Sequence, residues 1–235
     1  MDRDADTRPR HLQIAADLRA QIMAGVLAPG AQLPSTQQLV ERYSTANATV
    51  QRALSVLKDE GFLYGRPGKG VYVRDRQTFV VEVGAYLAPS PQGYSYRLLE
   101  VAEVNVPAEV AEILGEERAI LRRRLTLRDG DPVELTWSYY PLSIADGTPL
   151  AGRAKIPGGA PRVLADLGYP GREFTDRVST RAPTTEEVEG LALPEGVPII
   201  RQFRVVLSHE KRPVEVSAII KGGHYYELQY HQVVD

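Results

Sequence analysis

The stretch from Pro34 to Val73 constrains the fold of this chain more than any other part of the sequence. Ser35 and Gln38 form a capping box, which predicts the start of a short helix. A tight turn at 44–46 leads into a second helix, whose apolar residues recur at helical spacing from Val50. Two short helices joined by so short a turn predict a helix-turn-helix.

The segments on both sides of this pair complete a small domain. Apolar residues at helical spacing from His11 predict a preceding helix that ends before Gly25. After the pair, "FLYGRPGKGVYV" alternates like a hairpin, with the cations Arg66 and Lys69 at its glycine-rich tip. The whole order predicts a winged helix-turn-helix, whose second helix enters the major groove of DNA. A small helical bundle with a surface hairpin and no ligand is the alternative.

The predicted recognition helix begins with amides where cations are expected. Asn47 and Gln51 lie one turn apart beside the apolar stripe, and amide side chains suit the edge of adenine. We expect these two to read bases, whereas Arg52, Arg66 and Lys69 anchor phosphates; helix capping or phosphate contact is the alternative for the amides. The residues predicted to contact DNA are Ser35, Thr36, Gln37, Asn47, Thr49, Gln51, Arg52, Arg66, Lys69 and Gly70.

The run "QIAADLRAQIMAGVLAPGAQLPSTQQLVERY…TVQRALSVLKDEGFLYGRPGKGVYV" resembles the DNA-binding domain of the GntR superfamily of bacterial transcription regulators. Because members typically bind inverted-repeat operators as homodimers, the resemblance implies a double-stranded DNA partner and a homodimer. Many members carry arginine where this chain has Gln37, Asn47 and Gln51. This difference implies an operator whose core departs from the common guanine-dependent sites.

The composition fits a globular protein with 43% hydrophobic and 25% charged residues, at a formal net charge of −2. The absence of cysteine excludes disulfides and thiolate chemistry and favours a reducing compartment. The chain shows no secretory h-region and no apolar run near the ~18 residues of a spanning helix. We therefore expect a cytoplasmic protein with no membrane partner and no metal or cofactor.

The sequence divides into two predicted domains, residues 1–75 and 76–235. The second is rich in strand patterns, with helices expected at 108–114, 162–167 and 185–191, which predicts an α+β domain around an antiparallel sheet. Its two hairpins share the order strand, turn, Pro-Val-Glu, strand, which places Glu134 and Glu215 at equivalent positions. Two related halves around a shared cleft would explain this likeness, and convergent hairpin sequences are the alternative.

From about Phe79 to Val233 the chain resembles the UTRA effector-binding domain of the HutC subfamily, whose fold is similar to chorismate lyase. The segments "RDGDPVELTWSYYP", "LADLGYP", "LALPEGVPIIRQFRV" and "RPVEVSAIIKGGHYYELQY" carry the resemblance. It implies a small polar or anionic effector. An Arg-x-Arg of the family falls on Arg124 and Thr126 here, so only one of its two arginines is present. A cross-strand ion pair of Glu134 with Arg124, and a core position for Trp137, are the alternatives. The residues expected to bind the ligand are Arg124, Thr126, Glu134, Trp137, Tyr139, Glu215, Lys221 and Tyr225.

These features predict a DNA-binding transcription regulator, most simply a repressor whose operator binding is modulated by the ligand. One alternative is a ligand-independent repressor whose second domain only dimerises. A lyase-like enzyme is a weaker alternative, because the chain has no cysteine and its four histidines stand in no metal-spaced or triad motif.

Overall fold

The computed structural model describes residues 6–75, 79–82, 93–224 and 226–230. The chain forms two compact units, one comprising Met1–Thr78 with Pro194–Val197 and the other Phe79–Leu193 with Pro198–Asp235. Residues 76–78, which follow the predicted domain boundary, lie outside the described residues. Each unit is described by itself below.

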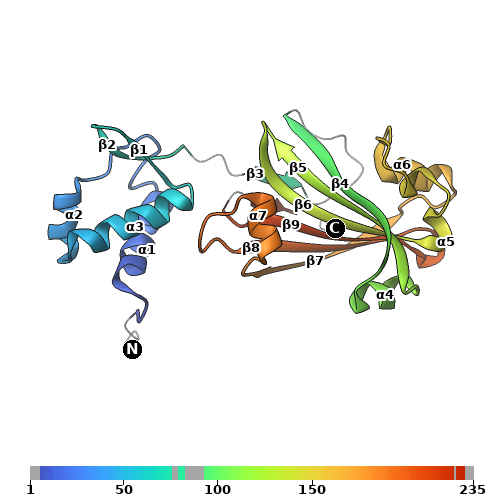
Figure 1. Ribbon diagram of the computed structural model, residues 1–235. Coiled ribbons are helices and arrows are strands. Elements are labelled where there is room, and N and C mark those ends of the chain that lie inside the picture. Colours follow the sequence, from blue (N-terminus) through green and yellow to red (C-terminus); the bar gives the residue numbers. More distant parts are fainter. Residues whose placement is uncertain (1–5, 76–78, 83–92, 225, 231–235) are drawn as a thin grey trace, which may run out of the picture. The chain divides into compact units, whose positions relative to one another are not determined.

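The N-terminal unit has the predicted helix-turn-helix and wing (Figure 1). The capping box is present, because Ser35 accepts from the backbone N–H of Gln38 while the Gln38 side chain accepts from the backbone N–H of Ser35. Its elements are α1 (Arg10–Met23), α2 (Thr36–Tyr43), α3 (Asn47–Asp59), β1 (Leu63–Arg66) and β2 (Gly70–Val73).

One apolar cluster holds these helices and the wing together. The predicted stripe of α3 is buried, at Val50, Ala53, Leu54 and Leu57. It packs with residues of α1, α2 and the hairpin, namely Ile14, Ala15, Leu18, Leu33, Leu39, Phe62, Leu63 and Val73. The opposite side of α3 is therefore left for solvent or a partner.

The C-terminal unit is built on a six-stranded antiparallel sheet of order β4-β5-β6-β9-β8-β7. Helices fill the connections, and two of the predicted helices are found at their expected bounds. The elements are β3 (Phe79–Glu82), β4 (Tyr94–Asn105), α4 (Ala108–Leu114), β5 (Arg118–Arg128), β6 (Asp131–Pro141), α5 (Leu142–Ala145), η2 (Pro149–Ala151), α6 (Gly159–Asp166), β7 (Glu173–Arg181), α7 (Thr185–Leu191), β8 (Ile199–Leu207), η3 (His209–Lys211), β9 (Pro213–Gly222) and β10 (Tyr226–Gln229).

The sheet consists of two similar halves that meet where β6 pairs with β9. Each half contains a strand, a helix and then a hairpin, β4-α4-β5-β6 in one and β7-α7-β8-β9 in the other. The hairpins share their register, since Thr126 lies opposite Glu134 and Val206 opposite Glu215. The repeated Pro-Val-Glu thus marks equivalent positions of Glu134 and Glu215.

The two faces of the sheet differ in chemistry because side chains alternate along each strand. One face is apolar and is covered by α4 and α7, with Leu125, Leu135, Phe203 and Val216 buried beneath them. The other face carries a buried polar row along its middle. At the end of that face, α5, η2 and α6 pack over an apolar cluster that includes Tyr140.

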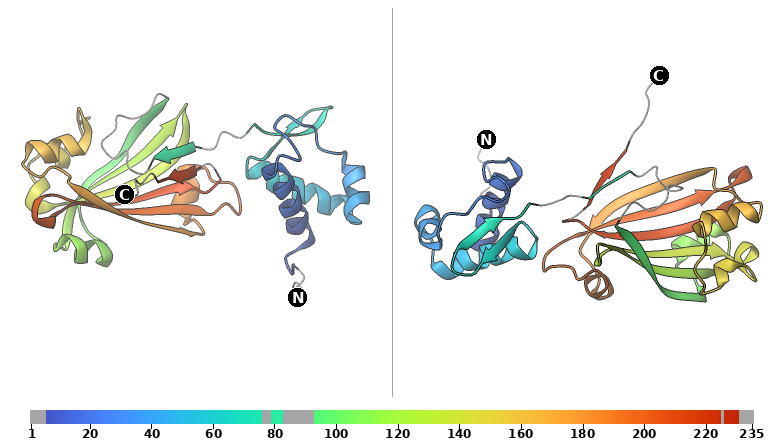
Figure 2. Two further views of the ribbon diagram at one scale, coloured as in Figure 1. Left: turned by 180° about the vertical axis from the view of Figure 1, so that it is seen from behind. Right: turned by 90° about the horizontal axis from the view of Figure 1, so that it is seen from above.

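A separate two-stranded element joins distant parts of the C-terminal unit. β10 pairs in parallel with β3, with Tyr226 opposite Phe79 (Figure 2). β3 is the first described segment after residues 76–78, and β10 follows β9 closely in the chain. The last described strand therefore holds the segment that enters this unit.

Candidate nucleic-acid interface and effector pocket

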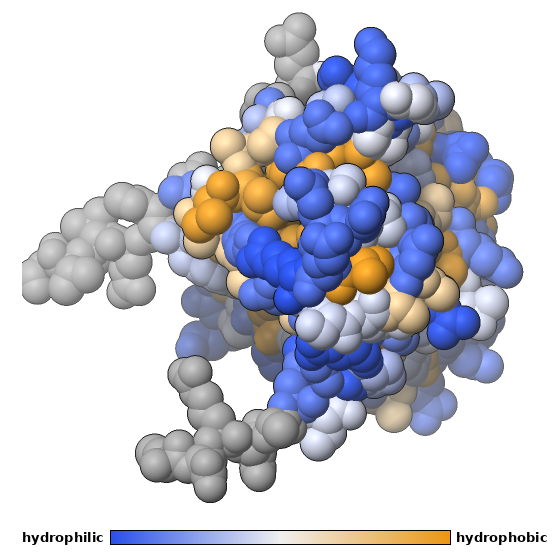
Figure 3. All heavy atoms as spheres, turned by 90° about the vertical axis from the view of Figure 1, so that its left-hand side faces the viewer, coloured by the Kyte–Doolittle hydropathy of each residue, from blue (hydrophilic) through white to orange (hydrophobic). Residues whose placement is uncertain are grey.

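The exposed side of α3 carries the predicted recognition residues. Asn47 is its first residue, and both Asn47 and Gln51 are exposed, as is Arg52. Thr49 is half-buried. Seen from the side that carries α2, hydrophilic residues cover most of the surface, with smaller apolar groups between them (Figure 3).

The Gln51 side chain is tied to the neighbouring helix. Its Nε2 donates a hydrogen bond of 3.1 Å to Oγ1 of Thr36. Thr36 is the first residue of α2 and follows the capping residue Ser35, while Gln37 beside it is exposed. The predicted DNA contacts at the start of α2 and in α3 therefore lie together on one surface.

The wing holds its cations in defined positions. The Arg66 guanidinium donates to the hydroxyl of Tyr64 (2.9 Å) and lies 5.3 and 4.7 Å from the ring centroids of Tyr64 and Tyr72. The carbonyl of Lys69 accepts from Nε2 of Gln32 at 2.7 Å and from the hydroxyl of Tyr72 at 3.2 Å. Such stacking and hydrogen bonding hold the hairpin tip and its cations in one arrangement.

Gly70 closes this hairpin in a conformation that favours glycine. Its φ is +113°, and a Cβ at this position would lie 2.7 Å from Nε2 of Gln32, the atom that holds the carbonyl of Lys69. A side chain at Gly70 would disturb the tip both through backbone strain and through this contact.

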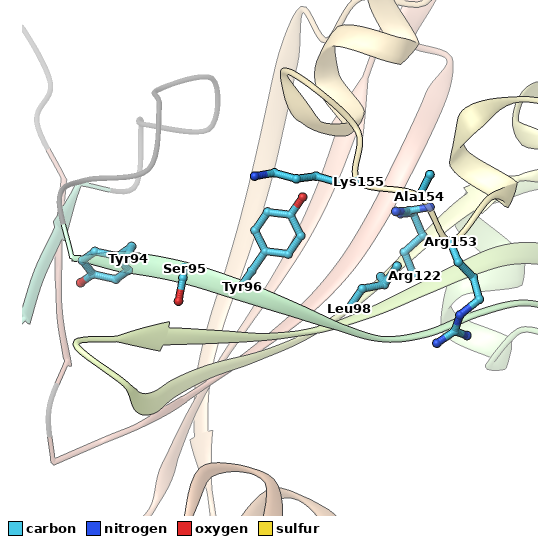
Figure 4. A pocket seen from close by; sticks show the side chains of 8 residues that line it. All are labelled: Tyr94, Ser95, Tyr96, Leu98, Arg122, Arg153, Ala154 and Lys155. Atoms are coloured by element: carbon cyan, nitrogen blue, oxygen red, sulfur yellow. The ribbon is translucent and has the colours of Figure 1, made fainter.

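A cavity of about 470 Å³ lies in the C-terminal unit, between β4 and the loop that follows η2 (Figure 4). Its charged lining residues are Arg122, Arg153 and Lys155, and among the described residues that line it none is acidic. The full lining is Tyr94, Ser95, Tyr96, Leu98, Arg122, Arg153, Ala154 and Lys155.

Arg122 is the buried charge of this cavity, with 4% of its surface exposed. Its Nη1 donates to the carbonyl oxygens of Leu150 (2.7 Å) and Gly152 (2.6 Å). Burial lowers its pKa, yet an arginine keeps its proton across the physiological range. Within the described chain, no carboxylate forms an ion pair with Arg122. A buried cation that is held only by carbonyls attracts a bound anion.

In the other half, the register counterpart of Arg122 is Gln202, which donates to Asp176 at 3.0 Å. Asp176 also forms a bidentate pair with Arg204, the counterpart of Arg124, with distances of 2.8 and 2.7 Å. Asp176 lies opposite Arg204 in the register of β7 and β8, and Leu98 lies opposite Arg124 at the corresponding place in β4 and β5. The first half thus has an apolar residue where the second has a carboxylate.

Several residues predicted to bind a ligand bind one another. Lys221, 2% exposed, donates to Glu134, which also accepts from Thr126 (3.4 Å) and Thr136 (3.1 Å). Burial raises the pKa of Glu134, but the charge and hydrogen bond of Lys221 and the hydrogen bond of Thr136 outweigh it and leave that pKa lowered. None of these residues lines the cavity.

A second chain of hydrogen bonds runs from Arg124 to Glu215. Arg124 donates to the hydroxyl of Ser138 (3.0 Å), which lies 2.7 Å from the hydroxyl of Ser217, and Ser217 donates to Glu215 at 2.6 Å. This chain crosses from one half of the sheet to the other, and it too lies outside the cavity lining.

The aromatic residues predicted for the ligand lie on the other face of the sheet. Trp137 packs against the cluster under α7 and Tyr139 against the cluster under α4. The core position for Trp137, raised as an alternative from the sequence, is thus the observed one. Tyr225 lies outside the described residues. Ligand contact by the predicted set remains a prediction, because the cavity is lined by other residues.

Sequence signals for the cavity existed but were weak. Arg122 stands two residues before Arg124 and therefore shares its face of β5. The aromatic alternation "YSY" supplies Tyr94 and Tyr96, and the loop "GRAK" supplies Arg153 and Lys155. These segments adjoin Arg122 only once the sheet and the loop after η2 have formed.

Among the described residues, the His, Asp and Glu side chains form no group of three or more that could hold a metal ion. In the same part of the chain, every helix is too short or too polar to cross a lipid bilayer.

Comparison with known proteins matches both units. A model described as bacterial regulatory proteins, gntR family, matches residues 10–73, and a UTRA domain model matches residues 91–227. An HTH-type transcriptional regulator of Streptomyces coelicolor is 29% identical over 96% of this chain and 93% of its own. The HTH-type transcriptional repressor NagR of Bacillus subtilis is 24% identical over 94% of each chain. A crystal structure of a GntR-family transcriptional regulator aligns with a TM-score of 0.65 at 25% identity, covering 97% of this chain and 99% of the other.

Proposed function

We propose that this chain, which belongs to the gntR family of bacterial regulatory proteins with a UTRA domain (the HutC type), is a repressor controlled by a small anionic ligand. Membership of this family makes it a DNA-binding regulator of transcription. Its relatives are named as regulators, so the lyase-like enzyme is excluded. The similar protein NagR is named as a repressor, which supports that direction of control here. The proposed site of action is the cytoplasm, where operator DNA is found.

On the DNA side, the proposal is a homodimer that binds an inverted repeat. A helix-turn-helix dimer must match half-sites about one helical turn, ~34 Å, apart. The preorganised cations of the wing and the exposed start of α3 support this use of the N-terminal unit. A ligand that changes the placement of the two N-terminal units would then weaken operator binding.

On the ligand side, one observation carries the proposal. Arg122 is buried at a cavity of about 470 Å³, without a carboxylate partner in the described chain. Arg153 and Lys155 line the same cavity and add positive charge. An arginine fork suits a carboxylate or a phosphate, and Tyr94 and Tyr96 offer aromatic walls for the rest of a small molecule. The predicted ligand is therefore a small anion.

Thermal unfolding of the full chain tests the ligand. The probes are inorganic phosphate, sugar phosphates and small carboxylic acids, each added to the wild type, Arg122→Met and the exposed-site control Arg172→Met. A ligand at 100 times its dissociation constant stabilises the folded state by about 2.7 kcal/mol. We expect at least one anion to stabilise the wild type and Arg172→Met, and to leave Arg122→Met unchanged.

The asymmetry of the two halves supplies a second variant. Leu98→Asp introduces a carboxylate at the place that Asp176 holds in the other half, so we expect it to remove the response to the anion. Leu98→Asn has the same size without the charge and should keep the response. A response that survives in both Arg122→Met and Leu98→Asp would place the ligand elsewhere.

The ligand-independent alternative makes a different prediction. If the C-terminal unit only dimerises, no probe shifts the unfolding temperature and none changes affinity for operator DNA. Selection of bound duplexes from random DNA supplies that operator. Measuring affinity for this operator in the presence of each anion then separates the two functions.

A further inference from the structure

The hydrogen bond between Gln51 and Thr36 joins α3 to α2 outside the buried core. Gln51 is exposed and Thr36 is half-buried, whereas the residues that pack α3 lie on its other side. Hydrogen bonds between exposed side chains contribute little to stability, because water replaces the lost partner. The consequence of this bond is thus the orientation of the Gln51 amide.

The bond leaves a defined pair of polar groups facing outward. A glutamine amide has two N–H donors and one acceptor oxygen. One N–H of Gln51 is used by Thr36, and the structure gives the Gln51 side chain no other partner among the described residues. One N–H and Oε1 remain for a ligand on one planar group. When Thr36 takes the N–H trans to Oε1, the N–H that remains lies beside Oε1.

Adenine is the base that matches this pair. In the major groove adenine presents the N7 acceptor beside the N6 donor, whereas guanine presents two acceptors, N7 and O6. A fixed amide with one donor and one acceptor can satisfy both adenine groups. Against guanine its Oε1 would face an acceptor, which is unfavourable.

From this geometry we infer that Thr36 is a positioning residue that fixes the Gln51 amide to read adenine in the operator. The inference rests on the proposed entry of α3 into the major groove. The two residues act together: Gln51 contacts the base, and Thr36 sets the orientation of the Gln51 amide.

Asn47 provides the internal contrast. It is exposed on the same helix, one turn earlier, and the structure gives its side chain no hydrogen bond among the described residues. A free side chain must lose rotational freedom when it binds, and a held one has already lost it. Gln51 should therefore discriminate between bases more strongly than Asn47.

Selection of duplexes with a randomised core tests this, using the full chain as wild type, Gln51→Ala, Asn47→Ala, Thr36→Val and Thr36→Ser. Valine keeps the shape of threonine and cannot accept the hydrogen bond, while serine keeps the acceptor. We expect the wild type to select adenine at one position of each half-site, and Gln51→Ala to lose roughly tenfold of that preference. Thr36→Val should lose much of it at the same position, and Thr36→Ser should retain it.

The double variant Thr36→Val with Gln51→Ala separates positioning from a general structural role. If Thr36 acts through Gln51, the double variant has the base preference of Gln51→Ala alone. If Thr36→Val lowers affinity for all duplexes equally without changing base preference, the inference is overturned. Guanine at the Gln51-dependent position also overturns it, because an amide whose oxygen accepts from Thr36 would present two donors.

Failure of the proposed function looks different. In that case the wild type enriches no inverted repeat at all. An enriched repeat whose bases are indifferent to Gln51 refutes the inference alone.

Discussion

The two units of this protein use polar side chains in opposite ways. In the N-terminal unit they are exposed and are held by neighbours, as Gln51 is by Thr36 and Arg66 by Tyr64. In the C-terminal unit they are buried in the sheet and neutralise one another, as Lys221 does with Glu134. Removing a side chain should therefore change binding in the first unit and folding in the second.

Arg122 is the exception within the sheet. It is as buried as Arg204, but carbonyl oxygens hold it in place of a carboxylate. Arg122 is thus the charge proposed to meet a ligand, whereas the paired charges of the sheet are structural.

The largest effect is expected from Lys221→Met. The change leaves the carboxylate of Glu134 in the sheet without its cation, and breaking a buried pair typically costs about 3–5 kcal/mol. Because Glu134 is half-buried, we expect a loss near the lower end, about 3 kcal/mol, by urea unfolding. Lys211→Met, at an exposed lysine, is the control and should be nearly neutral. If the double variant Lys221→Met with Glu134→Leu regains the lost stability, the unpaired carboxylate of Glu134 is the cause.

The next effect concerns acid, and it involves Glu187. Burial raises the pKa of Glu187, but hydrogen bonds from Arg181 and Thr184 and the Arg181 charge outweigh it and lower that pKa. A lowered pKa gives stability that is full above the unfolded value, about 4.3, and is lost as the pH falls through the folded value. Glu187→Gln should lower the free energy of unfolding by about 2 kcal/mol at neutral pH. It should lower it little at a pH where Glu187 is protonated in both the folded and the unfolded state. Urea unfolding at a series of pH values measures the difference; a constant cost would contradict it.

A matched pair of caps compares the two units directly. Ser35 with Gln38 and Thr184 with Glu187 both form capping boxes. Each change to alanine, at Ser35 or Thr184, removes one side-chain acceptor and should cost about 1 kcal/mol. Thermal unfolding followed by circular dichroism measures both. Caps are local, so equal costs are expected, and a much larger cost in one unit would show that its cap also supports long-range packing.

The smallest effect on stability is expected from Arg66→Ala. The side chain is exposed on the wing, so the free energy of unfolding should change by no more than about 0.5 kcal/mol. Binding to duplex DNA should weaken similarly for all sequences, and the salt dependence of log K should fall by about 1. Titrations at several salt concentrations measure this. A change of base preference would assign Arg66 to base reading.

Local signals explain why the N-terminal unit was predictable from the sequence. A capping box, a stripe from Val50 to Leu57 and a glycine-rich hairpin each act within a few residues, and all are found in the structure. The hairpins of the sheet and the helices α4 and α7 follow the same rule.

The cavity was not predictable because its parts are distant in sequence. Arg122 is placed by carbonyls of Leu150 and Gly152, and carbonyl groups carry no sequence signal. Glu134 and Lys221 are expected from the sequence to bind the ligand, and the β6–β9 register, which the sequence does not show, sets them opposite each other. Only the fold decides which charges are already satisfied.

The pairing of β3 with β10 has a consequence for biosynthesis. Strands β4 to β9, which form the large sheet, are all made before Tyr226 leaves the ribosome. β3, which begins at Phe79, is made before any of them. During translation, domains generally fold as they emerge, from the N-terminus onward. β3 therefore stays without its partner β10 until the whole sheet has been synthesised. The nascent protein acquires a folded N-terminal unit early, and the strand that follows residues 76–78 is fixed only after β9 and β10 have been made.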